Sequence, residues 1–523
     1  DFIAANPPRY GVNWACTMDV AIRVANWLLA FDILHSYGVE LDVAFVTVLA
    51  GSVADHASFI TSNLEWHPVF RSNHYLADIC GLAFAAAYLR DHRGGRRPEK
   101  AERWLAMASR ELAAETAAQF GPDGGNKEAS ICYHRLSTEM VIYTTALIST
   151  CGASSEWTKG QLGTIERALG FTAWAMKDSG QVPQIGDNDS GRFFMLAPAP
   201  TPVSVPEART RWANLVDYTE LEDNEQYWAQ DSLDHAHLLA AGGALISSGR
   251  RIPLSAPLAA ELALWSGTGD VPGALAEIAR SRWRGSSMPV VGTTTPPPGL
   301  TITPPYDPDL ARLQDAGTHD VVRWRVKPGG ASLADNLEAA AFPDFGLYIL
   351  RSPRLYLAFR CGPVGQSGAG GHSHNDQLGL EIEIDGCPWA RDPGSYLYTP
   401  LPAARNAYRS ARAHFVPRQG TEEPGDLEAG LFLLPERAHA RCLRFTPGGI
   451  TGVHYGYGLP TVREVHVTHA FIDVDDTIPK IEETAGPVLV GRATLESPGQ
   501  LAAFAAAALA FSPSYGVLES PHD

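Results

Sequence analysis

The stretch 378–384, Leu-Gly-Leu-Glu-Ile-Glu-Ile, alternates apolar and polar side chains with a period of two. That period is typical of a β-strand with one buried face. Segments 345–350 and 355–360 have strand composition and predict a hairpin, and turn residues recur at Asp385-Gly386 and Asp392-Pro393-Gly394. The C-terminal part, residues 336–523, is therefore predicted to be an antiparallel β-sandwich.

The N-terminal part of the chain has a helical period instead. Apolar residues recur at spacings of three and four, and they are apolar on most faces, which predicts helices buried against their neighbours. Such a row of hairpins indicates an α/α toroid, an incomplete barrel, over residues 1–287. Residues 288–308 hold seven prolines, so 288–335 is predicted to be a connector. The predicted helices cover 15–36, 40–64, 74–92, 98–118, 134–150, 157–177 and 228–241.

Composition narrows the class of protein. The 523 residues are 45% hydrophobic and 19% charged, which indicates a globular chain. The net charge of −17 disfavours nucleic acid as a partner, because an acidic surface repels phosphate, but it permits an anionic substrate in a local cationic cleft. Seven scattered cysteines without a C-x-x-C spacing do not form a disulfide framework.

Localisation and assembly are weakly constrained by the sequence. The longest apolar run, Leu501 to Phe511, is too short to span a bilayer, so no transmembrane segment is predicted. The chain starts at Asp1 without a signal peptide. We expect a periplasmic or secreted protein if a signal peptide precedes this start, and a cytoplasmic one otherwise. The oligomeric state stays open.

A histidine-rich block comes directly before the period-two strand: Gly371-His372-Ser373-His374-Asn375-Asp376-Gln377. Histidines at i and i+2 on a strand point to the same face. Asp392 follows His374 by 18 residues, and His414 comes later. Two imidazoles and a carboxylate make a zinc shell from His374, Asp392 and His414. The alternative is a polar edge strand and an ordinary turn aspartate.

Two further polar clusters lie at predicted helix starts. Asn73 and His74 open one helix, where Asn73 can equally be an N-cap and His74 a satisfied helix-start histidine. The triplet Tyr133-His134-Arg135 follows a glycine-rich stretch, and its alternative is a buried tyrosine with a satisfied hydroxyl.

A fourth cluster, Gly186 to Arg192, is rich in Asp and Asn. It lacks the twelve-residue calcium pattern with a terminal glutamate, so a turn is the default, with Asp187 or Arg192 as the residues that would line a sugar cleft. The sequence has no Walker A loop, strand-borne G-x-G-x-x-G, G-x-S-x-G or H-E-x-x-H motif. Nucleotide-dependent and serine esterase chemistry therefore lack support.

Together these clusters resemble the heparinase II/III-like polysaccharide lyases. The resemblance begins at Gly11-Val12-Asn13-Trp14, runs through Asn73-His74-Tyr75 and Tyr133-His134, and is densest at Gly371 to Leu378 and Asp392 to Tyr396. It implies an α/α toroid followed by an antiparallel β-sandwich, with further helices upstream of Asp1.

The resemblance also implies an activity, the β-elimination of a uronic-acid polysaccharide. Asn73 would hold the substrate carboxylate, and His372 would neutralise it. Tyr133 would protonate the leaving O4 oxygen and also act as base in a syn elimination. His74 would be the base for the opposite C5 epimer or help to bind the carboxylate.

Members of this family with a structural metal would use His374, Asp392 and His414, and the zinc would orient the strand of His372 without touching the bond that breaks. The sequence departs from the family pattern at Ser72, where many relatives have Asn, and at Phe415-Val416 after His414. No organic cofactor is expected. The predicted substrate contacts are His134, Arg135, Asp187, Arg192 and Tyr396, and the candidates for sulfate recognition are Arg71, Arg135, Arg192 and Arg405.

Two other function classes stay open at this point. A glycoside hydrolase would need two carboxylic acids beside the bond, for which Asp187 and Asp189 are the best pair. A non-catalytic exopolysaccharide-binding or assembly protein would bind without cleavage. The sequence does not choose among heparan-type chains, alginate, other glycosaminoglycans and bacterial exopolysaccharides, nor between endo and exo action.

Overall fold

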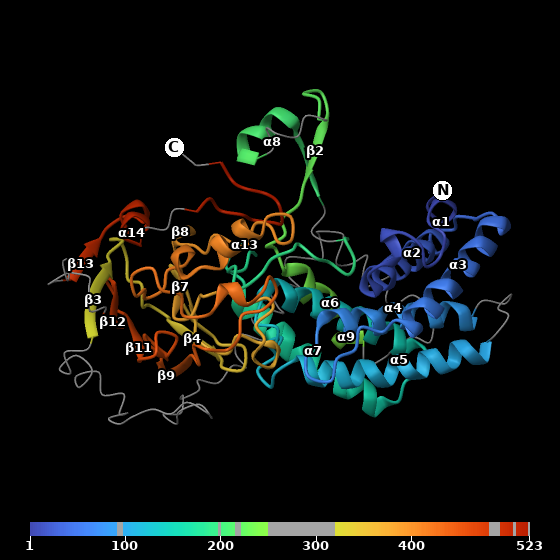
Figure 1. The fold of residues 1–523 in the computed structure, drawn as a ribbon, viewed down its shortest axis with the longest axis horizontal. Coiled ribbons are helices and arrows are strands. Elements are labelled where there is room, and N and C mark those ends of the chain that lie inside the picture. Colours follow the sequence, from blue (N-terminus) through green and yellow to red (C-terminus); the bar gives the residue numbers. More distant parts are fainter. Residues whose placement is uncertain are drawn as a thin grey trace.

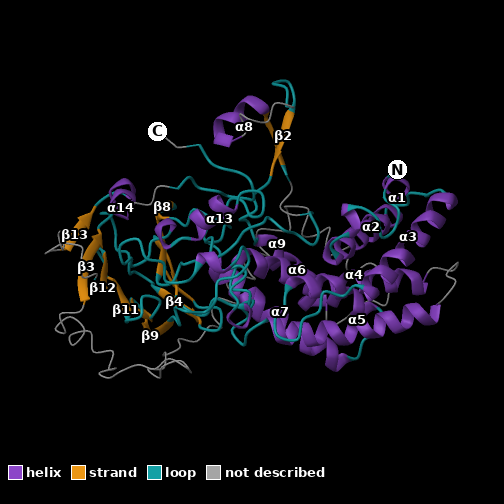
Figure 2. Cartoon of the chain, in the orientation of Figure 1, coloured by secondary structure: helices purple, strands orange, loops and turns teal. Residues whose placement is uncertain are grey.

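The computed structural model describes residues 1–91, 98–196, 200–214, 221–248, 319–480, 492–505 and 509–520. Helices gather at the N-terminal end of the molecule and strands at the other end (Figure 1 and Figure 2). The predicted order, an incomplete α/α toroid followed by a β-sandwich, is confirmed.

The main toroid helices, all but the last of them, agree closely with the predicted ones. They are α2 (Thr17–Ser36), α3 (Val43–Ser62), α4 (Asn73–Asp91), α5 (Pro98–Gln119), α6 (Ile131–Thr150), α7 (Ser155–Ala175) and α9 (Ala236–Ser248), with the shorter α1 (Phe2–Ala5), the 3-10 turn η1 (Val12–Trp14) and α8 (Val205–Arg211) beside them. Side-chain oxygens of Asp42, Ser130 and Ser154 accept backbone N–H groups in the first turns of α3, α6 and α7. These N-caps explain why the three helices begin where they do.

The prediction of a helix over 228–241 is wrong at its start. Residues 226–229 form strand β2 (Gln226–Ala229), which pairs antiparallel with β1 (Thr201–Ser204). The segment contains Tyr227 and Trp228, and aromatic residues favour strands where a pairing partner is available. The helix α9 begins only at Ala236.

The sandwich consists of two sheets. The first has the order β13-β3-β12-β11-β10-β9 and the second β4-β5-β6-β7-β8. All pairs in both sheets are antiparallel except β13 with β3, which is parallel. The strands are β3 (His319–Val326), β4 (Glu338–Phe342), β5 (Leu347–Arg351), β6 (Leu355–Arg360), β7 (Gly379–Ile384), β8 (Cys387–Ala390), β9 (Arg441–Thr446), β10 (Gly449–His454), β11 (Thr461–Val467), β12 (Ile472–Pro479) and β13 (Arg492–Leu495).

The predicted connector over 288–335 needs a correction at its C-terminal end. Residues 288–318 lie outside the described part of the chain. Residues 319–326 form β3, which pairs with β12 over its whole length. The segment reads His-Asp-Val-Val-Arg-Trp-Arg-Val, and its β-branched and aromatic residues suit a strand. The sandwich therefore includes residues that the proline count assigned to the connector.

The second sheet packs on the toroid with the face that does not cover the first sheet. Every residue of β5 and β6 is buried. Phe171 of α7 contacts Phe342 and Phe345, at ring-centroid distances of 5.0 and 4.7 Å. The predicted polar face of β7 is thus covered as well: Glu381 is buried and forms an ion pair with Lys177 of the toroid. This packing brings loops of both domains together.

Among the described residues, one helix, α3, is long and apolar enough to cross a membrane by length and composition, and 39% of its most apolar window is buried inside the protein. Core helices pass the same test, so this is weak evidence for a membrane span.

We expect Gly81 to be indispensable for the packing of α4 on α2. A Cβ at Gly81 would lie 2.5 Å from the Ala21 backbone, so Gly81→Ala is expected to destabilise the fold by about 1–3 kcal/mol. The matched control is Gly51→Ala in α3, where a Cβ meets nothing within 4 Å and the change should stabilise by up to about 1 kcal/mol. Denaturant unfolding measures both, and equal effects would contradict the close-packing argument.

Candidate functional site

Several predicted site residues meet where the toroid contacts the sandwich. Tyr133 comes from the first turn of α6, Asp187 and Asp189 from the loop that follows α7, His372 from the loop before β7, and Arg405 from α13 (Pro402–Arg409). We call these five residues, with Asn73 and Glu128, the interdomain cluster.

Tyr133 and His372 form the centre of the cluster. Their rings stack with centroids 3.6 Å apart and planes inclined by 18°. They are 5% and 9% exposed, so only a small part of each side chain reaches solvent. The Tyr133 hydroxyl donates a hydrogen bond of 2.7 Å to Asp189 Oδ2. Burial, together with the neighbouring Tyr398, Asp189 and Asp187, holds the pKa of Tyr133 well above its ordinary value, so the phenol stays protonated.

The His372 imidazole lies between two carboxylates. Its Nδ1 is 3.2 Å from Asp187 Oδ2, and its Nε2 is 3.2 Å from Glu128 Oε2. Burial works to lower the pKa of His372, but the hydrogen bonds and charges of Asp187 and Glu128 outweigh it and raise the pKa to about 9. His372 is therefore a cation at neutral pH and can stabilise negative charge beside Tyr133.

Asp187 links the cluster together. Arg405 donates two hydrogen bonds of 2.7 Å to its two carboxylate oxygens, and His374 Nε2 lies 3.0 Å from Oδ1. Burial works to raise the pKa of Asp187, but the Arg405 charge and the two histidines hold it well below its ordinary value. Asp187 is fully buried, which makes it a positioning residue and not a sugar contact.

Gly186 allows this contact between domains. It has φ of +70°, and a Cβ there would lie 2.6 Å from the His372 carbonyl oxygen. The backbone N–H of Asp187 donates to that same oxygen at 2.9 Å. Only glycine fits this close approach without strain.

Asn73 joins the cluster, whereas His74 does not contact it. The Asn73 backbone N–H and its side-chain Nδ2 both donate to Glu128, at 2.6 and 3.0 Å for the shorter contacts. Asn73, which the sequence also allowed as an N-cap, is thus the first residue of α4. Glu128, which is distant in sequence, accepts its backbone N–H. His74, one residue on, points to Glu65 instead, with Nδ1 3.3 Å from Oε1.

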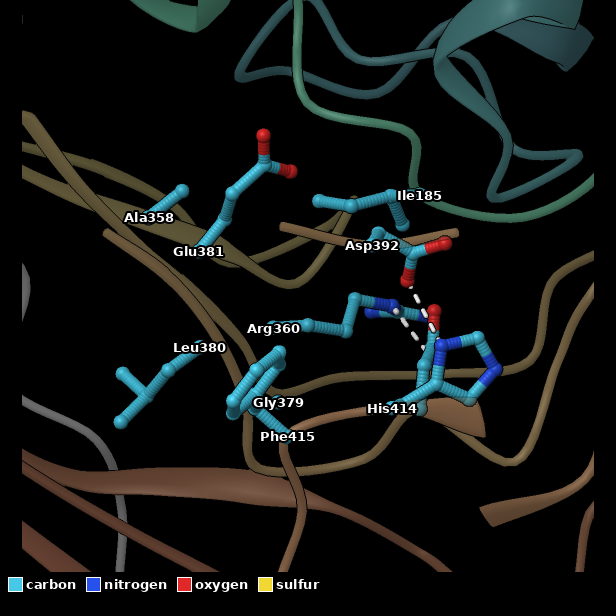
Figure 3. A pocket seen from close by; sticks show the side chains of 10 residues that line it. Ile185, Ala358, Arg360, Gly379, Leu380, Glu381, Asp392, His414 and Phe415 are labelled. Carbon is cyan, nitrogen blue, oxygen red and sulfur yellow. Dashed lines mark hydrogen bonds and ion pairs between the residues drawn. The ribbon is translucent and has the colours of Figure 1, made fainter. Parts of the chain in front are cut away.

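The three predicted zinc ligands come together in a second group beside the cluster. One ligand atom from each of His374, Asp392 and His414 lies within 4.8 Å of the others. His414 Nδ1 is 2.7 Å from Asp392 Oδ2, and Figure 3 shows this pair beside the small cavity that Glu381 and Arg360 also line. His374 Nδ1 and His414 Nε2 are buried without a hydrogen-bond partner.

These donors fit a zinc ion. Buried imidazole nitrogens without a partner are costly unless a ligand satisfies them. The other nitrogen of His374 is bound by the Asp187 carboxylate, which is the usual arrangement of a zinc-binding histidine. The group of His374, Asp392 and His414 is called the inner triad below.

Three of the predicted substrate contacts besides Asp187 are bound within the protein, and their role in substrate binding stays a prediction. His134 is fully buried between Phe120 and Phe171, and burial lowers its pKa to about 3, so it is a neutral core residue. Arg135 donates to the backbone carbonyls of Ser232 and Gly191. Arg192 forms an ion pair with the buried Glu139. Tyr396 is half-buried beside Tyr408 and stays a prediction.

Sequence reasoning missed one residue of the site. Glu128 contacts both Asn73 and His372, although no pattern in the sequence marked it. Tyr398 is 6% exposed and its ring lies 4.5 Å from the Arg405 guanidinium. Arg405 was proposed as a sulfate contact, but Asp187 occupies its guanidinium. No local pattern predicts these pairs, because their partners are far apart in sequence.

Comparisons with known proteins identify the family of the chain. The family model described as "Heparinase II/III N-terminus" matches residues 1–197, and "Heparinase II/III-like, C-terminal" matches 334–503. The chain therefore belongs to the heparinase II/III-like family. A comparison with curated protein sequences gives no match.

Similar solved structures include the heparan sulfate lyase HepC from Pedobacter heparinus, with 14% identity, a TM-score of 0.44, and coverage of 92% of this chain and 57% of that chain. A heparinase III structure has 15% identity, a TM-score of 0.48, and coverage of 91% and 58%. The heparinase III BT4657 gene product has 13% identity, a TM-score of 0.47, and coverage of 90% and 57%. The chain thus spans a little over half the length of these proteins.

We expect Asp187 and Arg405 to act as one energetic unit. Arg405→Met leaves the Asp187 carboxylate without its main buried partner and should destabilise the fold by about 3–5 kcal/mol. In a double-mutant cycle with Asp187→Asn, the double variant should lose about 0.5–3 kcal/mol less than the two single losses combined. Guanidinium unfolding measures all four proteins.

The control for this cycle is the more exposed pair of Arg325 with Asp473, whose atoms are 2.7 Å apart. Arg325→Met should destabilise by at most about 1 kcal/mol, because water screens that pair. Additive losses at Asp187 and Arg405 would show that their contact does not hold the two domains together.

Proposed function

We propose that this chain is a polysaccharide lyase that cleaves a uronic-acid-containing polysaccharide by β-elimination, leaving a 4,5-unsaturated uronate end. Membership of the heparinase II/III-like family supports the class of activity. The observation that carries the proposal is the stacked pair of a protonated Tyr133 and a cationic His372 at the domain contact.

The elimination requires the protein to neutralise the substrate carboxylate, to take the proton from C5 and to protonate the leaving O4 oxygen. The C5–H and C4–O4 bonds break, a C4–C5 double bond forms, and the O4 oxygen takes up a proton. His372 supplies positive charge for the substrate carboxylate as negative charge develops next to C5. Tyr133 is the proton donor to O4, because its raised pKa keeps the phenol protonated until a leaving oxygen of higher basicity appears.

The contacts favour Tyr133 over His74 for the C5 proton too. The Tyr133 proton passes to O4 as the same phenol oxygen takes the proton from C5, so Tyr133 is protonated before and after the step, and the 2.7 Å hydrogen bond to Asp189 orients its hydroxyl. This corresponds to a syn elimination. The contacts of His74 are with Glu65 and the Cys16 thiol, away from the cluster.

Recognition through carboxylates is favoured over recognition through sulfates. The arginines proposed for sulfate are each bound by the protein: Arg71 by Glu115, Arg192 by Glu139, Arg405 by Asp187, and Arg135 by backbone carbonyls. A sulfate would have to compete with these partners. His372, in contrast, already holds the Glu128 carboxylate at Nε2, 3.2 Å away, and a substrate carboxylate would have to take over that one position while Asp187 stays bound at Nδ1. The substrate class is thus an acidic polysaccharide whose uronate groups are read directly.

The hydrolase alternative receives no support from the geometry. It would need Asp187 and Asp189 as a pair of carboxylic acids beside the bond. Asp187 is fully buried and bound by Arg405, His372 and His374. A carboxylate held in this way cannot donate a proton or attack a sugar.

We also propose that the inner triad holds a structural zinc ion. When bound, the ion fixes His374, and through the Asp187 hydrogen bond it restrains His372 beside Tyr133. The zinc takes no part in the elimination itself.

Tyr133→Phe is expected to reduce the rate of elimination by at least about a hundredfold, because it removes the proton donor while keeping the ring stack on His372. The purified chain is incubated with alginate, heparan sulfate, other glycosaminoglycans and bacterial exopolysaccharides, and the ultraviolet absorbance of the unsaturated product is followed.

Tyr348→Phe serves as the matched control, since Tyr348 packs on Phe445 in the sandwich core and should keep full activity. A rise in absorbance that persists in Tyr133→Phe would overturn the role of this tyrosine. New reducing ends without any absorbance would replace the lyase proposal with hydrolysis.

His414→Ala should lower the zinc content by one equivalent per chain and reduce the thermal stability, because His374 and Asp392 lose the third ligand. Metal analysis after exhaustive dialysis and thermal unfolding provide the two readouts. His454 is the control, a buried sandwich histidine outside the triad, and His454→Ala should leave the zinc content unchanged. Equal zinc content in wild type and His414→Ala would contradict the proposed site.

A further inference from the structure

A second group of metal-binding residue types lies on the toroid, away from the inner triad. Cys16 precedes α2, Glu65 lies between α3 and α4, and His74 is in the first turn of α4. One ligand atom from each lies within 4.8 Å of the others. We call these three residues the outer triad.

The spacing of the outer triad matches a tetrahedral ion. Cys16 Sγ is 3.9 Å from Glu65 Oε2, and His74 Nδ1 is 3.3 Å from Glu65 Oε1. Ligands at typical zinc distances of about 2.0–2.3 Å stand about 3.3–3.8 Å apart on a tetrahedron. An ion would therefore fit between these side chains with only small shifts.

The protein holds the central ligand in place. Glu65 accepts a hydrogen bond from the Met18 backbone N–H at 3.0 Å, and its own N–H donates to Asp78 at 2.8 Å. The Met18 contact thus orients the carboxylate and the Asp78 contact holds the Glu65 backbone before any ion arrives, which lowers the entropy that binding must overcome.

The donor set and its exposure indicate which ion would bind. A thiolate with an imidazole and a carboxylate suits zinc or cobalt and disfavours calcium and magnesium, which prefer oxygen ligands. The side chains of His74 and Glu65 are 46% and 31% exposed, so water can complete the shell and an ion can enter from solvent.

We propose that the outer triad is a binding site for a thiophilic divalent cation such as Zn²⁺, distinct from the inner triad and independent of the proposed lyase activity. Binding releases the thiol proton of Cys16 and the Nδ1 proton that His74 shares with Glu65 to solvent, and the ion links the start of α2, the α3–α4 loop and the first turn of α4. Asn73, which contacts Glu128 in the interdomain cluster, adjoins this link.

Cobalt distinguishes the two triads, because only the outer one contains sulfur. The full chain is first loaded with zinc and dialysed against a mild chelator, which removes zinc from the solvent-exposed outer triad, and Co²⁺ is then titrated under anaerobic, reducing conditions. We expect a near-ultraviolet thiolate-to-cobalt charge-transfer absorption that saturates at one equivalent per chain. Cys16→Ser should abolish this absorption.

Two further variants complete the test. Cys387→Ser removes another cysteine, which is exposed and outside both triads, and should leave the absorption unchanged. His74→Ala should weaken cobalt binding by at least about tenfold while circular dichroism stays that of the wild type.

The proposal is overturned if the wild-type chain gives no thiolate–cobalt absorption at millimolar Co²⁺, or if the absorption survives Cys16→Ser. None of these readouts uses polysaccharide cleavage, so a failed lyase assay and a failed metal titration are told apart.

Discussion

The buried contact between Arg405 and Asp187 is the interaction on which the rest of the site depends. Two charges removed from water need nearly ideal geometry to offset their desolvation, and the paired 2.7 Å hydrogen bonds provide it. The two residues come from different domains, so the pair also fixes how the sandwich sits on the toroid. His372 and His374 then take their orientation from the same carboxylate. One aspartate thus sets the position of a proposed catalytic cation and of a proposed metal ligand.

This dependence explains why residue types expected to touch substrate lie inside the protein. An imidazolium can be kept charged in a dry site only if carboxylates surround it, and these carboxylates in turn need fixed partners. Asp187 and Glu128 satisfy His372, while Arg405 and Asn73 satisfy them. Only a small part of Tyr133 and of His372 is left for a ligand. The polar residues of the motif therefore act mostly by positioning these two rings.

The sequence was sufficient for the architecture but only for part of the site. Local periodicity predicts the toroid helices and the strands around 378–384, because a period is a property of neighbouring residues. It fails at 226–229 and 319–326, where pairing with a distant strand decides the structure. The three zinc-type ligands could be chosen by residue type and spacing. Glu128 and the burial of His134 could not, since both depend on which helices and loops meet in space.

The two triads carry similar donors in different surroundings, and the surroundings determine what an ion would do in each. In the inner triad the histidines are buried and His374 is already oriented by Asp187, so a bound ion exchanges slowly and acts on the shape of the interdomain cluster. In the outer triad His74 is exposed and solvent reaches the ligands, so an ion there exchanges with ions in solution. The occupancy of the site then follows the concentration of the free ion. An ion at the first position is then part of the folded structure, whereas an ion at the second reports on the medium around the protein.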